Sequence, residues 1–159
     1  VRLNVPISEI TKHVDSCSLC LSKGLGAPMG SVLVGDAALI DKARKWRKML
    51  GGGMRQAGIM AAAGLFALKN HVTGLSEDHA KAAHFSKGVR DLKAIKLQDK
   101  PQTNMVMLQA SEKVLAELKS FLNEHNVLIS SERLVFHRDI STESSNYLVK
   151  LFEIFDATR

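Results

Sequence analysis

The stretch that decides the fold is residues 16–34, SCSLCLSKGLGAPMGSVLV. Two apolar, β-prone runs enclose three glycines and a proline, which predicts strand, turn, strand with Lys23 at the end of the first strand. A lysine at the rim of a buried sheet can lose its proton by desolvation and act as an amine nucleophile. A solvated lysine that opens a hairpin loop explains the same pattern, so the residues alone leave both interpretations open.

Two motifs carry a resemblance to a known family. The run SLCLSKGLGAPMGSVLVG, followed by RKWRKMLGGGMRQAGIMAAAG, resembles the pyridoxal-phosphate (PLP) lysine region of the threonine aldolases, which have the aspartate-aminotransferase fold. The resemblance implies an α/β fold, comprising the last strands and helices of a large three-layer PLP domain and a small α+β C-terminal lobe. It begins well inside such an enzyme, so an N-terminal part with much of the cofactor pocket is expected to be missing.

The resemblance also implies a reaction. Lys23 would be the Schiff-base lysine that binds PLP covalently, in a lyase of amino-acid metabolism that cleaves L-threonine or L-allo-threonine to glycine and acetaldehyde. Members are homodimers or homotetramers with shared active sites. The base that takes the β-hydroxyl proton is not identified in this chain. Because residues that hold the cofactor ring and phosphate are expected outside it, we expect residues 1–159 alone to be inactive.

Three further cations are candidate site residues. Arg55 follows three glycines at the start of an expected helix, where free N–H groups and the helix dipole favour an anion. A glycine helix end followed by a surface arginine fits equally well. By resemblance, Arg55 and Lys48 approach the cofactor phosphate, Arg55 from a neighbouring subunit. Arg133 opens the strand RLVFH and by resemblance grips the substrate α-carboxylate, although residues 130–132 depart from the family pattern.

Other polar residues have structural interpretations. We interpret His137 and Asp139 as a structural pair and Asn104 as a strand-edge residue. The pair Cys17-x-x-Cys20 has the spacing of a metal or redox site. In a strand, however, residues three apart point to opposite faces. We therefore expect two free, buried or half-buried thiols and no metal.

Composition limits the class of protein. The chain has 159 residues, 45% hydrophobic and 24% charged, which suits one domain or two small lobes. It contains no apolar run of about 20 residues and its start does not resemble a signal peptide. We expect a soluble cytoplasmic protein with no membrane partner, and free cysteines agree with a reducing compartment.

The net charge of +6 leaves a second class of function open. Much of the excess lies in residues 42–48, KARKWRK, where a helix would place most cations opposite Ile40, Ala43, Trp46 and Leu50. We interpret this as a solvated helix face and expect no nucleic-acid partner, since the chain has one Trp and one Tyr. The alternative is a non-enzymatic module that binds an anion or nucleic acid through residues 42–48 and 51–55. Another alternative keeps PLP but changes the reaction, as in a β-eliminating lyase or a hydroxymethyltransferase-like aldolase.

The polar segment 90–102 is the expected boundary between two domains. Residues 1–90 would end the large PLP-binding domain, and residues 91–159 would form the small C-terminal α+β domain. Expected strands are residues 15–22, 31–35, 104–108, 127–130 and 133–137. Expected helices are residues 8–12, 37–49 with Asp36 as N-cap, 54–71, 76–89, 111–124 and 142–157.

Overall fold

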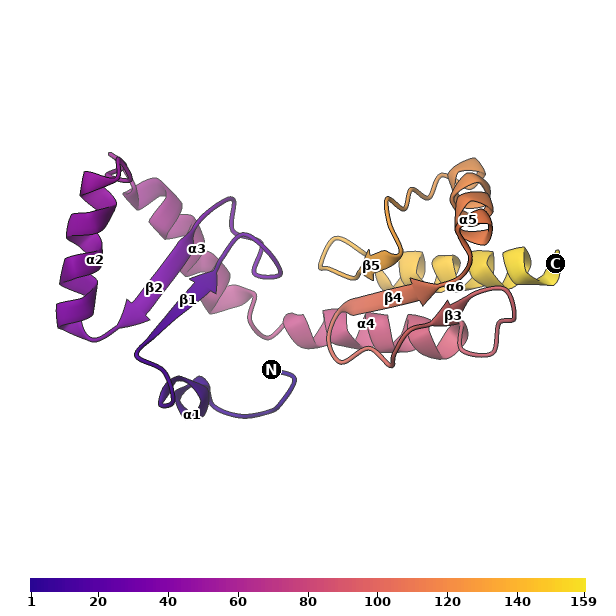
Figure 1. Ribbon diagram of the computed structural model, residues 1–159, viewed down its shortest axis with the longest axis horizontal. Helices are drawn as coiled ribbons and strands as arrows, with labels where there is room; N and C mark the ends of the chain where they lie inside the picture. The colour runs from indigo at the N-terminus through magenta and orange to yellow at the C-terminus, as the bar shows by residue number, and fades with distance from the viewer. The chain divides into compact units, whose positions relative to one another are not determined.

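The computed structural model describes residues 1–159 and contains two compact units, one within residues 1–75 and one within residues 76–159 except that Arg2 groups with the second (Figure 1). The first holds α1 (Ile7–Thr11), β1 (Ser16–Cys20), β2 (Ser31–Gly35), α2 (Ala37–Met49) and α3 (Gly58–Asn70). α4 (Leu75–Gly88) begins at the division, and the second unit continues with β3 (Lys96–Leu97), β4 (Met105–Gln109), α5 (Glu112–Glu124), β5 (Arg133–Val135) and α6 (Thr142–Ala157). No helix has both the length and the apolar composition needed to cross a membrane.

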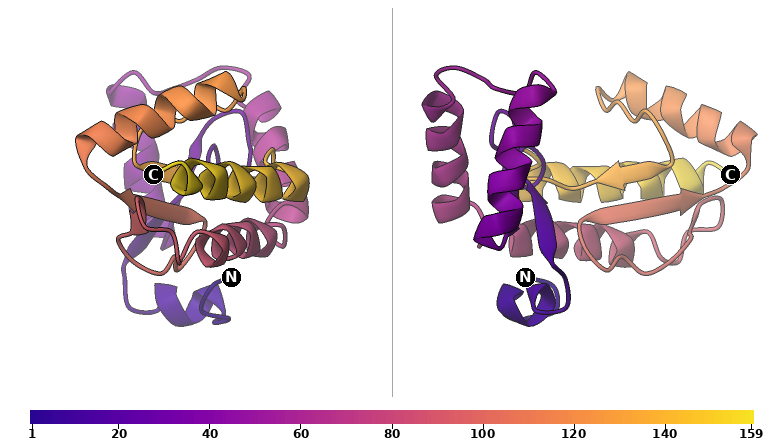
Figure 2. Two further views of the ribbon diagram at one scale, coloured as in Figure 1. Left: turned by 90° about the vertical axis from the view of Figure 1, so that its right-hand side faces the viewer. Right: turned by 60° about the vertical axis from the view of Figure 1, so that its left-hand side comes forward.

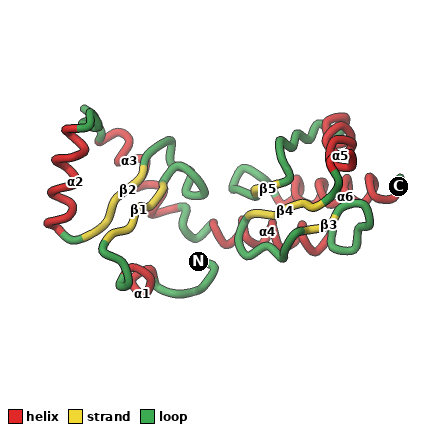
Figure 3. Tube along the Cα trace, in the orientation of Figure 1, coloured by secondary structure: helices red, strands yellow, loops and turns green.

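The first unit is built on an antiparallel hairpin. β1 pairs with β2 in the register Cys17↔Val34 and Leu19↔Val32, and a ten-residue loop, residues 21–30, joins the strands (Figure 3). The predicted bounds of the second strand are confirmed. The Asp36 side chain accepts a 2.7 Å hydrogen bond from the N–H of Leu39 and caps α2, as predicted.

Helix α3 differs from the prediction at its start and in its burial. It begins at Gly58, because Gln56 has φ +52°, outside the right-handed helical region. The prediction that Arg55 lies in the first helical turn is therefore wrong; Arg55 lies in the turn before the helix. Only two residues of α3 are buried, although its alanine-rich, apolar composition is typical of a largely buried helix. Its buried residues are Gly64 and Ala67, whereas Ile59, Leu65 and Phe66 are 57–69% exposed.

The second unit packs a three-stranded antiparallel sheet, in the order β3-β4-β5, against helices. Val106 and Leu108 alternate with exposed residues along β4, so one face of the sheet enters the core. α6 lies between α4 and α5 (Figure 2), and its Phe152 ring stands 5.1 Å from the Phe85 ring of α4. The sequence predicts two helices for this sheet, residues 111–124 and 142–157. Helix α4 is a third, because its apolar stripe (Ala82, Phe85) joins this core.

Two segments of the second unit depart from the expected elements. Residues 127–130 form no strand, because the N–H of Val127 bonds the carbonyl of Leu122 at 2.9 Å and ends α5. The short strand β3 is not predicted. The contacts divide the chain between Leu75 and Ser76, one helix before the expected boundary. The division into residues 1–90 and 91–159 stays a prediction.

Candidate functional site

Lys23 lies in the loop between β1 and β2, residues 21–30, which we name the lysine loop (Figure 3). The N–H of Leu21 donates to the carbonyl of Gly30 at 3.0 Å, and the N–H of Ala27 donates to the carbonyl of Leu21 at 3.0 Å. Within this frame the N–H of Gly26 closes a turn on the carbonyl of Lys23 at 2.8 Å. Gly26 and Gly30 have φ of +68° and +106°, which residues with a side chain rarely adopt. These two glycines therefore allow the backbone turns that the loop requires.

Buried side chains fix the lysine loop to α3. Leu21, Leu25 and Ala27 are 6–7% exposed and pack with Ala67 of α3. Full burial of a leucine side chain stabilises by about 1.5–3 kcal/mol, so the two leucines are strong anchors. Lys23, between them in sequence, is exposed. The loop therefore presents its lysine amine to solvent from a firmly packed base.

Two glycines allow this close packing. A Cβ atom on Gly64 of α3 would lie 2.9 Å from Cδ1 of Leu21, and one on Gly24 would lie 2.9 Å from Cδ2 of Leu75. Both distances are too short for a real contact, so a larger residue at either glycine would force the leucine side chain to shift. The contact with the lysine loop therefore explains the small residue at Gly64.

The lysine loop also changes the acidity of a neighbouring thiol. Cys20 Sγ lies 3.7 Å from the hydroxyl of Ser22. Hydrogen bonds from the side chain and backbone of Ser22, together with the charge of Lys23 and a hydrogen bond from Ser31, lower the pKa of Cys20 below its ordinary value, against a smaller opposing effect of burial. Cys17 and Cys20 are free and half-buried, as predicted.

Lys48 lies beside a loop of three glycines, residues 51–53. The structure gives a reason for the glycine at each of these three positions. Gly51 has φ +85°. A Cβ on Gly52 would lie 3.0 Å from Cγ of Arg47, and a Cβ on Gly53 would lie 2.7 Å from Cδ and 3.1 Å from Nζ of Lys48. The Lys48 side chain therefore folds over the backbone of Gly53. This places its ammonium group against the glycine loop.

The predicted site residues fall into separate groups. Arg55 is exposed two residues after the glycine loop, so Lys48 and Arg55 flank the same segment. Lys23 lies in a different loop of the same unit. Arg133 belongs to the second unit, where it is exposed at the start of β5 opposite Met107 of β4. Its neighbour Leu134 faces the core, so Arg133 lies on the other side of the strand.

The residues given structural interpretations have the expected contacts. His137 Nδ1 lies 3.5 Å from a carboxylate oxygen of Asp139. Asn104 Nδ2 donates to the carbonyl of Phe136 at 2.8 Å, while the N–H of Phe136 donates to the carbonyl of Asn104 at the same distance. These two hydrogen bonds continue the pairing between β4 and β5.

Helix α2 exposes both its basic side chains and part of its apolar stripe. Its basic side chains are exposed, as a solvated face requires. Trp46 and Leu50, on the stripe opposite the cations, are 58% and 81% exposed, because no element of this chain covers that stripe.

One residue of the site is missed by the sequence. The Nδ1 atom of His71 lies 2.6 Å from the carbonyl oxygen of Leu25 and so holds the lysine loop from the end of α3. The two residues are 46 positions apart, and a single histidine at a helix end gives no signal of such a contact.

Comparisons with known proteins agree with the expected resemblance. The chain is 48% identical over 147 residues to the low specificity L-threonine aldolase of Escherichia coli (strain K12), covering 90% of this chain and 43% of that protein. It is 39% identical over 162 residues to low-specificity L-threonine aldolase 1 of Arabidopsis thaliana, covering 96% of this chain and 45% of that one. It therefore spans less than half the length of these curated relatives.

Solved structures confirm the fold class. A putative L-allo-threonine aldolase from Listeria monocytogenes superposes with a TM-score of 0.81 at 16% identity, over 97% of this chain and 48% of that one. A serine palmitoyltransferase from Sphingomonas wittichii superposes with a TM-score of 0.72 at 16% identity, over 95% and 42%. The family model described as beta-eliminating lyase matches residues 1–113. The chain belongs to the beta-eliminating lyase family.

Proposed function

We propose that this chain is part of a PLP-dependent aldolase that cleaves L-threonine or L-allo-threonine to glycine and acetaldehyde. The observation that carries the proposal is Lys23, an exposed amine on a loop that buried leucines fix to α3. Relatives at 48% and 39% identity are named low-specificity L-threonine aldolases, which supports the substrate class.

The residues present fit covalent attachment of PLP. Lys23 supplies an exposed primary amine. Lys48 and Arg55, on either side of the glycine loop, are the cations that we assign to the cofactor phosphate, since ionised donors bind phosphate strongly. When bound, PLP supplies an electron sink for breaking the substrate Cα–Cβ bond.

The chain's own side chains have distinct roles in this proposal. Lys23 would hold the cofactor covalently through its Nζ atom. The guanidinium group of Arg133 binds the substrate carboxylate with two parallel hydrogen bonds and orients the molecule. The base that takes the β-hydroxyl proton lies outside the residues assigned here.

The proposed partners are an amino-acid substrate and further copies of the enzyme, as a homodimer or homotetramer in the cytoplasm with shared active sites. Exposed apolar side chains support further contacts with protein surfaces. They gather on α2 and α3 and include Trp46, Met49, Leu50, Ile59, Leu65 and Phe66. We expect residues 1–159 alone to be inactive.

The test is borohydride reduction of the intact protein with PLP, followed by mass spectrometry of its peptides. We expect a pyridoxyl group on the peptide that contains Lys23. Lys23→Ala should abolish acetaldehyde release from L-threonine, whereas Lys42→Ala, which removes an exposed lysine of α2, should leave it unchanged. A label on another lysine, or full activity of Lys23→Ala, would contradict the assignment.

Two further assays separate the alternatives. Pyruvate release from L-serine without acetaldehyde release from L-threonine would indicate an eliminating lyase and contradict the aldolase proposal. Steady acetaldehyde release by residues 1–159 alone would show that the expectation of inactivity is wrong.

A further inference from the structure

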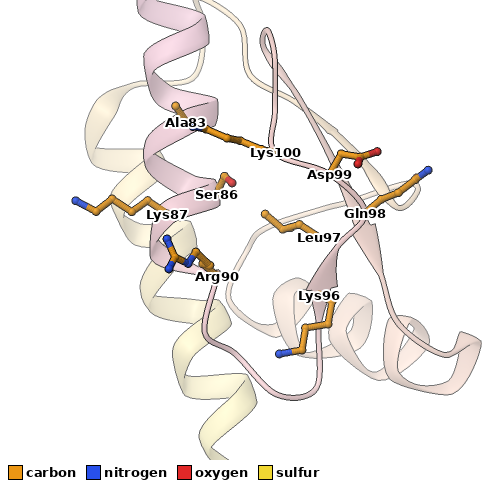
Figure 4. Close-up of a pocket in the computed structure, with 9 residues that line it drawn as sticks. All are labelled: Ala83, Ser86, Lys87, Arg90, Lys96, Leu97, Gln98, Asp99 and Lys100. Carbon is orange, nitrogen blue, oxygen red and sulfur yellow. The ribbon is translucent and has the colours of Figure 1, made fainter.

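A groove in the second unit lies between α4 and the segment that contains β3 (Figure 4). Its volume is about 610 Å³, within the range of small-molecule sites. It is lined by Ala83, Ser86, Lys87, Arg90, Lys96, Leu97, Gln98, Asp99 and Lys100. None of these residues belongs to the proposed aldolase site.

The fold explains why one side of the groove is polar. Along α4, Ala82 and Phe85 enter the core, followed by Val89 just past the helix end. The adjacent stripe, with Ser86 and Lys87, faces outward at helical spacing. The opposite wall is β3, an edge strand that pairs with β4 alone. From this wall, Leu97 and Lys100 point toward α4 (Figure 4).

The groove is strongly basic. Four of its lining side chains are cationic and one, Asp99, is anionic, so four minus one leaves a net charge of +3. The carboxylate of Asp91 lies 3.8 Å from Nε of Arg90, but both side chains are largely exposed and the pair is weak. Lys96 Nζ donates to the carbonyl of Leu92 at 2.5 Å, which leaves two of its three donors free.

We propose that this groove binds a small molecule that carries two or more adjacent phosphate groups. Lys100 extends from the β3 side toward α4, whereas the ammonium group of Lys87 points away from the groove (Figure 4). Lys87 of α4, Arg90 just after this helix and Lys96 of β3 are exposed, so their side chains are free to turn and bind successive phosphates. Ser86 adds a neutral hydrogen-bonding group, and Leu97 adds an apolar surface. A single phosphate would leave most of the volume and charge unused.

A nucleic-acid strand fits the groove less well. Single-stranded binding sites combine a basic track with aromatic side chains on which bases stack. No aromatic side chain lines this groove, and its cations lie within one concave pocket. The observations therefore favour a compact polyphosphate over a polymer.

The experiment is isothermal titration calorimetry of inorganic tripolyphosphate into the intact protein saturated with PLP, so that any cofactor phosphate site is already filled. We expect one tripolyphosphate to bind per chain, and orthophosphate to bind at least about tenfold more weakly, since it can engage fewer cations. ATP is titrated in parallel. If ATP binds more tightly than tripolyphosphate, the ligand of this groove is a nucleotide. If tripolyphosphate binds more tightly, the ligand is a linear polyphosphate.

Two double variants with equal loss of charge provide the comparison. Lys87→Gln with Arg90→Gln should weaken tripolyphosphate binding at least about tenfold. Lys113→Gln with Lys150→Gln removes two exposed lysines of α5 and α6 and should change it less than about twofold. All four side chains are exposed, so both variants should keep the thermal unfolding temperature of the parent.

Three results would overturn the proposal. They are no heat of binding with tripolyphosphate, equal weakening in both double variants, and tighter binding of a short oligothymidylate than of tripolyphosphate. The last result would assign the groove to nucleic acid.

Discussion

The Nδ1 atom of His71 lies 2.6 Å from the carbonyl oxygen of Leu25, which joins the end of α3 to the loop that carries Lys23. The imidazole ring also packs edge to face on Phe66, with 5.4 Å between ring centroids. The conformation of the lysine loop thus depends on a side chain from a distant part of the sequence.

His71→Leu should loosen the lysine loop. The substitution removes the partner of a partly buried carbonyl, which costs about 1 kcal/mol of unfolding free energy. We expect faster amide hydrogen exchange in residues 21–30, measured by mass spectrometry, because local opening becomes easier.

His125→Leu is the matched control for this measurement. His125 Nδ1 lies 2.8 Å from the carbonyl of Phe121, a similar contact in the second unit. Its loss should speed exchange at the end of α5 and leave residues 21–30 unchanged. Equal exchange of the lysine loop in parent and His71→Leu would show that the histidine does not hold it.

Gly88→Ala should destabilise the second unit. The new Cβ would lie 2.6 Å from Cγ1 of Val149, a buried β-branched residue of α6 with little freedom to move. Overpacking of this kind costs about 1–3 kcal/mol, which urea unfolding would measure.

Two variants check that cause. Gly58→Ala places a Cβ in open space at the start of α3 and should be neutral or stabilising by up to about 1 kcal/mol. Val149→Ala combined with Gly88→Ala should be less destabilising than the two separate losses added together. Simple additivity would rule out the clash.

Lys81→Met should be more damaging than its place on α4 suggests. Lys81 Nζ lies 2.9 Å from a carboxylate oxygen of Asp78, and the two side chains are 12% and 3% exposed. The same ammonium donates to the carbonyls of His137 and Ile140 at 3.0 and 2.9 Å. Its removal leaves a buried carboxylate unpaired, at a cost of about 3 kcal/mol or more in chemical denaturation.

The companion variant Asp78→Asn with Lys81→Met removes the unpaired charge as well. It should recover part of the lost stability, because a neutral amide is cheaper to bury than a carboxylate. Equal stability of the single and double variants would mean that the carboxylate is not the source of the cost.

Asp156 should make the second unit sensitive to acid. Burial raises the pKa of its carboxyl group, but hydrogen bonds from the N–H groups of Ala94 and Lys93 and the charges of Lys93 and Lys96 outweigh this and hold the pKa below its ordinary value of 3.8. The stabilisation is fully present above the unfolded pKa and is lost as the pH falls through the lower folded value.

Asp156→Asn should therefore lower the unfolding free energy at pH 7 by about 1–2 kcal/mol. The difference from the parent should shrink as the pH falls below about 4. If the difference in unfolding free energy between the parent and Asp156→Asn stays constant down to pH 2, protonation of Asp156 is not the cause of the acid sensitivity.

Elements with strong local signals are predictable from the sequence. The bounds of α6 match the prediction, and the Ser141 side chain caps it by accepting from the N–H of Ser144 at 3.0 Å. Ser111 caps α5 in the same way, through the N–H of Val114. In both cases the cap and the apolar stripe lie within one continuous segment.

Elements that depend on distant partners are not predictable in this way. β3 exists only through its pairing with β4, Lys96↔Gln109 and Leu97↔Leu108. The apolar run at residues 127–130 has the composition of a strand but is used to end α5.

The same contrast holds for the candidate site. Glycine spacing predicts the turn around Lys23, whereas the contact of His71 with Leu25 depends on how the chain folds back.

The seat of the lysine loop on α3 has a consequence for ligand binding. Its strand frame, buried leucines, glycine contacts and histidine all come from residues 16–75, and none of these contacts needs a bound molecule. The conformational entropy of ordering ten loop residues is therefore lost when the unit folds. A molecule that reacts at Lys23 meets a side chain carried by a preorganised loop backbone, so more of its intrinsic binding energy remains as affinity.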